Sequence, residues 1–174
     1  MPSSYLEITI KPHVIRRNKE LTQEIKKSID NGVLCWLATV SPENVPNVSP
    51  KEVFNYYGTD KIIIAKIDSP ELVKNINQFE NVCLSFIDIW VQKGFQVKGK
   101  ARIVTKSDSE FSKKGKVLSK MTVENYPFDS ITEITLKKVK PIIAPNYILN
   151  PETREQEQIE SAKNTYVFIL ETNL

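Results

Sequence analysis

The sequence predicts a mainly β fold, an antiparallel barrel with a few flanking helices. Six segments rich in β-branched and apolar residues, bounded by turn residues, have the length and spacing of hairpin strands, and only a few segments show helical periodicity. Short strands in this arrangement are typical of antiparallel barrels. A chain of 174 residues with 40% apolar residues is long enough to bury one core. We therefore expect residues 1–174 to form one domain, with a C-terminal extension from about residue 141.

The first predicted helix precedes the main strands. Residues 21–29 carry apolar side chains four positions apart, with polar and charged residues between them. This spacing predicts an amphipathic helix, and Asn31-Gly32 is a typical C-terminal stop. Ahead of the helix, an alternating piece at residues 5–10 has the pattern of an edge strand.

A strand, a tight turn and a second strand are the centre of the predicted fold. Residues 33–40 form the apolar, β-branched run of a buried strand, and Ser-Pro-Glu-Asn at 41–44 has the composition of a turn. The second strand carries Asn47, Ser49 and Lys51 at every second position, so their side chains point to one face. An amide, a hydroxyl and an ammonium group in a row suit a phosphate. The alternative is an ordinary solvated strand face.

A second helix follows the third strand, which spans residues 61–67. Ser69 is a favourable N-cap, a proline occupies the first helical position, and the apolar spacing predicts a helix over residues 70–79. A helix N-terminus directs free N–H groups and partial positive charge toward whatever lies beyond it. Lys74 and Asn75 lie one turn further on, so this end of the helix is a second candidate for holding an anion.

The rest of the chain supplies the remaining predicted elements. They are strands at 82–90, 95–105 and 131–143, a hairpin turn at 92–94 and a helix at 107–125. One face of the middle strand carries Gln96, Lys98, Lys100 and Arg102. Residues 152–163 are strongly helix-forming but polar almost all round, which suits a surface helix or one that crosses to a partner chain. Tyr166–Leu170 has the composition of a last strand.

Several kinds of active site are poorly supported by the composition. His13 is the only histidine and precedes the predicted core, which argues against a Ser-His-Asp triad, a histidine metal site and haem ligation. The sequence has no Cys-x-x-Cys pair, no Walker loop and no Gly-x-Gly-x-x-Gly, and its five glycines leave no place for a glycine-rich phosphate loop. We expect no metal, and any bound phosphate must be held by side chains and a helix terminus.

The charge and the cysteines bear on partners and compartment. A net charge of +3 is too small to favour an extended nucleic-acid surface. No apolar run reaches membrane-spanning length, so no membrane partner is expected. Cys35 and Cys83 lie far apart in apolar, strand-like runs, which fits reduced, buried thiols in a cytoplasmic protein.

Four pieces of this sequence together match a known pattern. They are Leu-Ala-Thr-Val at 37–40, Pro-Asn-Val-Ser-Pro-Lys at 46–51, the Ser-Pro and Lys-Asn-Ile of 69–76, and Gly-Phe-Gln-Val-Lys-Gly at 94–99. In this order and spacing they resemble the pyridoxamine 5′-phosphate oxidase-like flavin-binding split-barrel superfamily, over roughly residues 21–104. The resemblance implies a six-stranded antiparallel split β-barrel that forms a homodimer, with FMN in a groove between the two subunits.

The resemblance also assigns roles to residues. In such proteins, basic and hydroxyl side chains of the second strand and of the start of the helix after the third strand hold the FMN phosphate. A glutamine on the strand after the long hairpin contacts the flavin ring. The implied cofactor-binding residues are Asn47, Ser49, Lys51, Ser69, Lys74, Asn75 and Gln96. Trp36 and Trp90 are candidate walls for the flavin ring, although a core position is favoured for Trp36. No residue is assigned as a catalytic acid or base.

The chain departs from the true oxidases near its C-terminus. Those enzymes carry an Arg-x-His segment that holds the substrate, whereas no histidine follows His13 here, so oxidation of pyridoxamine phosphate is not expected. Glu71 also replaces a basic residue found in many relatives. The leading prediction is an FMN-dependent oxidoreductase acting on an unknown small molecule, with a deazaflavin as the alternative cofactor. Two further alternatives remain: a flavin-binding carrier or sensor without turnover, and a flavin-free module that binds another anion on the basic strand 98–102.

Overall fold

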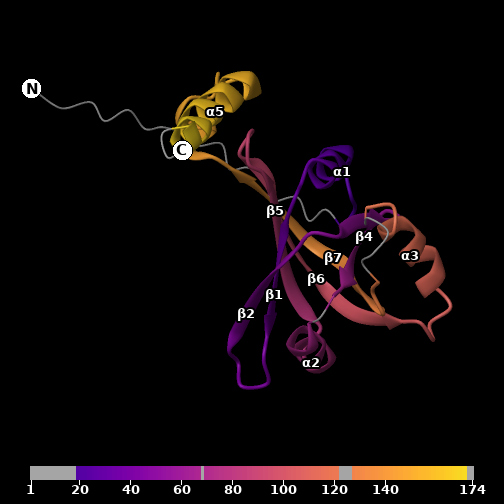
Figure 1. The fold of residues 1–174 in the computed structure, drawn as a ribbon. Coiled ribbons are helices and arrows are strands. Elements are labelled where there is room, and N and C mark those ends of the chain that lie inside the picture. Colours follow the sequence, from indigo (N-terminus) through magenta and orange to yellow (C-terminus); the bar gives the residue numbers. More distant parts are fainter. Residues whose placement is uncertain (1–18, 68, 122–126, 172–174) are drawn as a thin grey trace, which may run out of the picture.

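One seven-stranded antiparallel sheet forms the body of the molecule (Figure 1). The computed structural model describes residues 19–67, 69–121 and 127–171. The strand order is β2-β1-β5-β6-β7-β4-β3. The strands are β1 (Cys35–Val40), β2 (Pro46–Lys51), β3 (Phe54–Tyr57), β4 (Lys61–Lys66), β5 (Asn81–Asp88), β6 (Lys93–Thr105) and β7 (Ser130–Ile143). The predicted mainly β, antiparallel class is confirmed.

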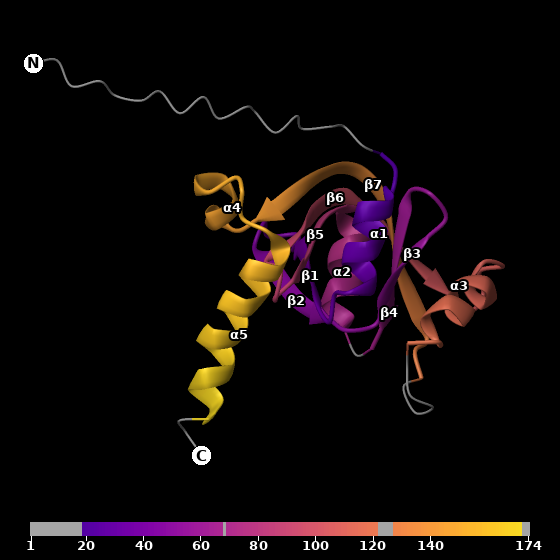
Figure 2. The same cartoon turned by 90° about the horizontal axis from the view of Figure 1, so that it is seen from above.

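Five helices surround this sheet in the described part of the chain. They are α1 (Gln23–Asp30), α2 (Pro70–Gln78), α3 (Phe111–Leu118), α4 (Pro145–Leu149) and α5 (Glu155–Glu171). The first begins where Thr22 accepts a hydrogen bond from the backbone N–H of Ile25 at 3.3 Å, which satisfies one free donor of the first turn. Figure 2 shows α3 and α5 on opposite sides of the molecule. None of the described helices is long and apolar enough to cross a membrane.

The core lies on both faces of β4, which explains its continuous apolar run. Ile62 and Ile64 belong to the main core with α1 and α2, whereas Ile63 and Ala65 pack beneath α3. Three aromatic rings form the centre of the main core, with centroid separations of 6.1 and 6.2 Å: Phe54, Phe86 and Phe95. β4 is thereby packed between helices on both sides, with α1 and α2 on one face and α3 on the other.

A buried ionic cluster lies beneath α3. The side chain of Lys114 is 0% exposed, and its Nζ lies 2.6 Å from Oε2 of Glu133, which is 2% exposed. Arg102 donates from Nε to the other Glu133 oxygen at 2.7 Å, and Glu110 accepts from Lys114 at 2.7 Å. Burial favours the neutral form of Glu133, but hydrogen bonds from Lys114 and Arg102 outweigh it and lower the pKa of this carboxyl group. Arg102 is therefore committed to internal ion pairs.

Several sequence-based element predictions need correction. The strand predicted at Tyr166–Leu170 is wrong, because α5 continues through it to Glu171. A helix gains a hydrogen bond with each added residue, whereas a strand needs a neighbouring strand. The extra strand β3 follows β2 after a two-residue bend and is too short for its pattern to predict. Residues 145–149, for which no helix or strand was predicted, form α4.

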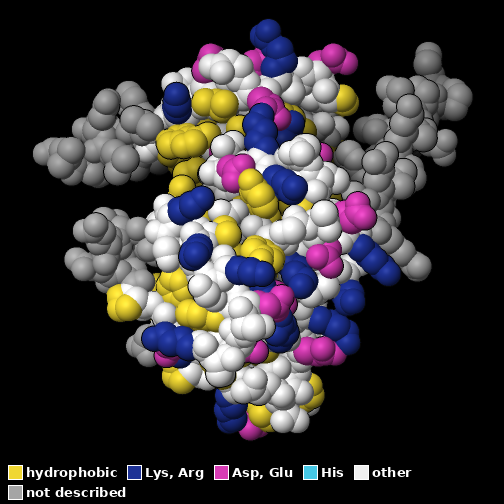
Figure 3. Space-filling view, turned by 90° about the vertical axis from the view of Figure 1, so that its right-hand side faces the viewer, with side chains coloured by type: hydrophobic (Ala, Val, Ile, Leu, Met, Phe, Trp, Pro, Cys, Tyr) yellow, Lys and Arg dark blue, Asp and Glu magenta, His cyan; other side chains and the backbone are white. Residues whose placement is uncertain are grey.

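Other predictions are placed differently or not tested. The helix predicted at 107–125 begins only at Phe111 and ends at Leu118. Trp36, predicted as core, is 48% exposed. The edge strand predicted at 5–10 and the residue His13 lie outside the described residues. On the side at the right of Figure 1, acidic, basic and apolar side chains are interspersed (Figure 3), in keeping with the small net charge.

Candidate functional site

The three polar residues of β2 share one face, as predicted. In the β1–β2 register, Asn47 lies opposite Thr39, Ser49 opposite Leu37 and Lys51 opposite Cys35. All three β1 residues are buried. The row on β2 alternates with exposed positions and is itself half-buried. The polar row therefore faces the side of the sheet on which α2 packs.

Lys51 and Ser69 meet between the end of β2 and the start of α2. Lys51 donates from Nζ to Oγ of Ser69 at 2.8 Å, and Ser69 donates to the backbone carbonyl of Ile67 at 3.2 Å. No carboxylate forms an ion pair with Lys51 in the described residues. Burial lowers the pKa of Lys51, an effect partly opposed by the facing Cys35. A partly desolvated ammonium group without an acidic partner among the described residues is suited to an anionic ligand.

Two further donors lie at this junction. Oγ of Ser49 is buried without a hydrogen-bond partner among the described residues. The first turn of α2 has Pro70 at its start, and Ser69 makes no side-chain capping bond to it. A buried hydroxyl left unpaired is costly, and an uncapped helix N-terminus leaves backbone donors free. The residues present fit a phosphate group.

Asn75 and Lys74 have different surroundings although they are adjacent on α2. Asn75 is fully buried, and its Nδ2 donates to Oγ1 of Thr39 at 3.1 Å, while Oδ1 has no partner among the described residues. Lys74 is exposed. Its charge adds to hydrogen bonds from Ser41 and the backbone in lowering the pKa of Glu43, in the β1–β2 turn. Asn75 thus attaches α2 to β1, and Lys74 lies nearer the hairpin turn.

Gln96 is on the opposite face of the sheet from Lys51. It lies in register with Ser85 of β5, which pairs with Trp36 of β1, and directly opposite residues of antiparallel strands point to the same side. Trp36 faces away from the buried Cys35 and Leu37. One chain therefore does not bring Gln96 together with the six other predicted site residues.

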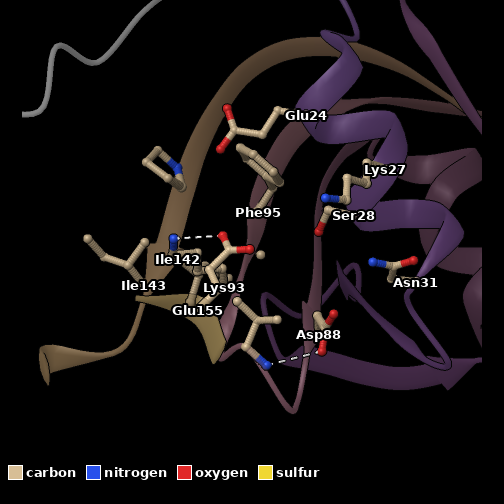
Figure 4. Close-up of a pocket in the computed structure, with 13 residues that line it drawn as sticks. Glu24, Lys27, Ser28, Asn31, Asp88, Lys93, Phe95, Ile142, Ile143 and Glu155 are labelled. Carbon is tan, nitrogen blue, oxygen red and sulfur yellow. Dashed lines mark hydrogen bonds and ion pairs between the residues drawn. The ribbon is translucent and has the colours of Figure 1, made fainter. Parts of the chain in front are cut away.

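Two pockets lie near the β5–β6 hairpin, and neither is lined by any of the seven predicted residues. The first holds about 160 Å³ between α1 and the ends of β6 and β7, where Lys93 and Glu155 form a 2.9 Å ion pair (Figure 4). Both acidic and basic side chains line this first pocket. The second holds about 490 Å³ and is mainly apolar; it is lined by Ile87, Ile89, Trp90, Gln92, Ile142, Ile143, Ala144, Pro145 and Tyr166.

Sequence reasoning missed Thr39 and the second pocket. Thr39 pairs with Asn47 and points to the same face, so the alternation of side chains along β1 could have indicated that Thr39 lies at the site. The pocket forms where the end of β7, the start of α4 and Tyr166 of α5 come together, and no local signal in the sequence marks such a meeting. The described residues contain no group of three His, Cys, Asp or Glu side chains that could hold a metal.

Cys35 is unsuited to nucleophilic chemistry despite its place beside Lys51. Burial raises the pKa of its thiol to about 12, although Lys51 opposes part of that shift. Only the thiolate is a strong nucleophile, so Cys35 is an inert core residue at neutral pH. Both cysteines are free.

Comparison with known proteins agrees with this fold. An FMN-binding protein from Syntrophomonas wolfei subsp. wolfei has a TM-score of 0.61 at 19% identity, with 71% of this chain and 87% of that chain covered. HupZ of Group A Streptococcus has a TM-score of 0.57 at 24% identity, covering 68% and 90%. General Stress Protein 26 from Bacillus anthracis str. Sterne has 0.53 at 18% identity, covering 68% and 91%. The fold is the predicted split β-barrel.

The family follows from a sequence match. The family model described as Pyridoxamine 5′-phosphate oxidase matches residues 21–141, well over half of the chain. The chain belongs to this family. No curated protein matches the sequence significantly. Residues beyond 141, including α4 and α5, lie outside the family match.

Proposed function

We propose that the protein is a homodimeric, cytoplasmic FMN-binding flavoprotein that acts as an oxidoreductase on a small molecule. Membership of the pyridoxamine 5′-phosphate oxidase family supports a flavin, as does the likeness to a protein named for binding FMN. The observation that carries the proposal is the junction of Lys51, Ser69 and Ser49 at the N-terminus of α2.

This junction would hold the phosphate of FMN. Lys51 offers a charge with no acidic partner among the described residues, and Ser69 already lies within hydrogen-bond distance of it. The unpaired hydroxyl of Ser49 would gain a partner. Asn47 and Lys74 would extend the polar surface at either side, and Asn75 would act by fixing α2 against β1.

A second copy of the chain would complete the site. Gln96 and Lys51 face opposite sides of one sheet, so a single bound flavin can contact both residues only when they come from different subunits. The face that carries Gln96 is apolar on β1 and β2, where Trp36 is 48% and Val48 54% exposed. Exposed apolar patches of this kind mark interfaces. A two-fold dimer would bury both copies of the patch and form two equal sites.

FMN, when bound, supplies the electron-transfer chemistry, and the chain binds, orients and shields it. Lys51, Ser49 and Ser69 would fix the phosphate end, and Gln96 would set the position of the ring. Trp36, on the same face as Gln96 with Ser85 of β5 between them, would exclude water from one edge. No side chain is assigned to proton transfer.

The experiment is the absorption spectrum of freshly purified protein, followed by anaerobic addition of NADH or NADPH. A flavin band that bleaches on reduction supports an oxidoreductase. A flavin band that neither cofactor bleaches favours a carrier or sensor instead. Absence of a flavin band, together with failure to take up added FMN, would overturn the proposal.

A further inference from the structure

Three exposed lysines form a row on the outer face of β6 and β7. Lys98 lies opposite Lys138, and Lys140 lies opposite Gln96. None of the three forms an ion pair within the described residues, whereas Lys100 is paired with Glu80. Arg102 is paired as well, with Glu110 and Glu133. The sequence suggested the basic residues of the strand at 98–102 as an anion-binding set. In the fold, only Lys98 of that set belongs to the unpaired row, and β7 supplies the other two lysines.

The lysine row carries an electrostatic penalty. Like charges directly opposite each other on neighbouring strands repel, and Lys98 and Lys138 are such a pair. An anion beside the row would relieve this repulsion, and the free ammonium groups would become its donors.

The apolar pocket of about 490 Å³ adjoins the row on the same face. Its lining residue Ile142 pairs with Gly94, two positions along from the Lys140–Gln96 pair. Because strands rise about 3.3 Å per residue, Ile142 and Lys140 are about 7 Å apart along β7 and Lys138 is about 13 Å from Ile142. The pocket and the row form one surface, apolar at one end and positive at the other.

The walls of the pocket come largely from this chain's own extension. Five of its lining residues follow residue 141, where the family match ends: Ile142, Ile143, Ala144, Pro145 and Tyr166. The volume is within the range of small-molecule sites, which are mainly apolar with a few polar groups. The lining residues of the pocket that carry a polar side-chain group are Trp90, Gln92 and Tyr166.

We propose that this surface binds an amphipathic organic anion, with an apolar ring body in the pocket and an anionic group on the lysine row. Charge complementarity selects the anionic end, and the pocket lining selects the apolar end. Gln96 lies opposite Lys140, at the end of the row nearer the pocket. The role of this molecule as the substrate therefore rests on the proposed flavin function, whereas its binding does not.

The test compares two probes with the same ring body. 1-Anilinonaphthalene-8-sulfonate carries an anionic group, and N-phenyl-1-naphthylamine does not. Fluorescence titrations use the full-length wild type and the variant K98Q/K138Q/K140Q. A matched control, K113Q/K116Q/K120Q, removes two exposed lysines of α3 and one exposed lysine two residues after its end, away from the pocket (Figure 2). Ala144→Trp fills the pocket.

The sulfonate should bind the wild type saturably, and the triple variant should weaken it by about 3- to 100-fold, as expected for three exposed charge contacts. The control should change it less than about twofold. The neutral probe should be unaffected by either lysine variant, and Ala144→Trp should weaken both probes. Unfolded protein is recognised by circular dichroism and excluded.

Equal loss in both lysine variants, or no loss in either, overturns the proposal. Failure of the sulfonate to bind the dimer, with binding restored on dilution to monomer, also overturns it and assigns the pocket to a second copy. FMN uptake is measured in the same variants. Retained FMN with no probe binding refutes this site alone, whereas probe binding without FMN refutes the flavin proposal alone.

Discussion

Replacing Lys51 with alanine tests the proposed phosphate site most directly. FMN carries a dianionic phosphate, and taking it out of water requires compensating charge and donors. One charge-assisted hydrogen bond contributes about 1.5–3 kcal/mol, so Lys51→Ala should weaken FMN affinity by about 10- to 150-fold. Lys51 is half-buried and has no acidic partner among the described residues, so its charge is only partly screened.

The assay is quenching of flavin fluorescence, with FMN and riboflavin titrated against wild type and two variants. Lys74→Ala is the matched control, since Lys74 is an exposed lysine near the same helix end; it should cost less, because the helix N-terminus remains. Riboflavin lacks the phosphate and should bind wild type and Lys51→Ala equally weakly. The Lys51–Ser69 bond is also lost, so thermal unfolding of the apoprotein is measured to separate stability from affinity. Equal FMN affinity of Lys51→Ala and wild type would refute the site assignment.

Four further outcomes are expected. Trp36→Glu places a charge on the apolar outer face and should shift the dimer toward monomer with loss of FMN, measured by light scattering; an unchanged dimer would show that this face is not the interface. Lys114→Met leaves Glu133 with fewer partners and should lower the free energy of unfolding, measured in urea, by about 3 kcal/mol. The double variant Lys114→Met/Glu133→Leu should recover most of this lost stability. A double variant no more stable than the single one would contradict this interpretation. Folding lowers the pKa of Glu133, so this carboxylate contributes to the stability of the fold above about pH 4.3. That contribution is lost as the pH falls through the pKa of Glu133 in the folded protein. The stability of the wild type should therefore fall more in acid than that of the double variant. Pyridoxamine phosphate should not be oxidised at about 1 per second or faster, and turnover at that rate would contradict the prediction made from the missing C-terminal histidine.

Local pattern determined most of the elements of this protein. The apolar run of β1, the turn at 41–44 and the alternation of β2 predict the hairpin, since side-chain period and turn chemistry are properties of a few adjacent residues. Asn44 indeed has a positive φ of 63°. The same alternation placed Asn47, Ser49 and Lys51 on one face before any tertiary contact was known.

Tertiary structure decided which of those residues meet. The Lys51–Ser69 contact joins positions 18 apart in sequence, and the pairing of Asn75 with Thr39 joins positions 36 apart. Strand register also placed Gln96 on the face opposite to that of Lys51, a relation that depends on three strand pairings: β6–β5, β5–β1 and β1–β2. On this face, Lys98, Lys138 and Lys140 form no ion pair with any described residue, whereas Lys100 and Arg102 do, because only folding brings Glu80 and Glu133 to those two. Long-range register and ion pairing depend on the whole sheet, and a local pattern carries neither.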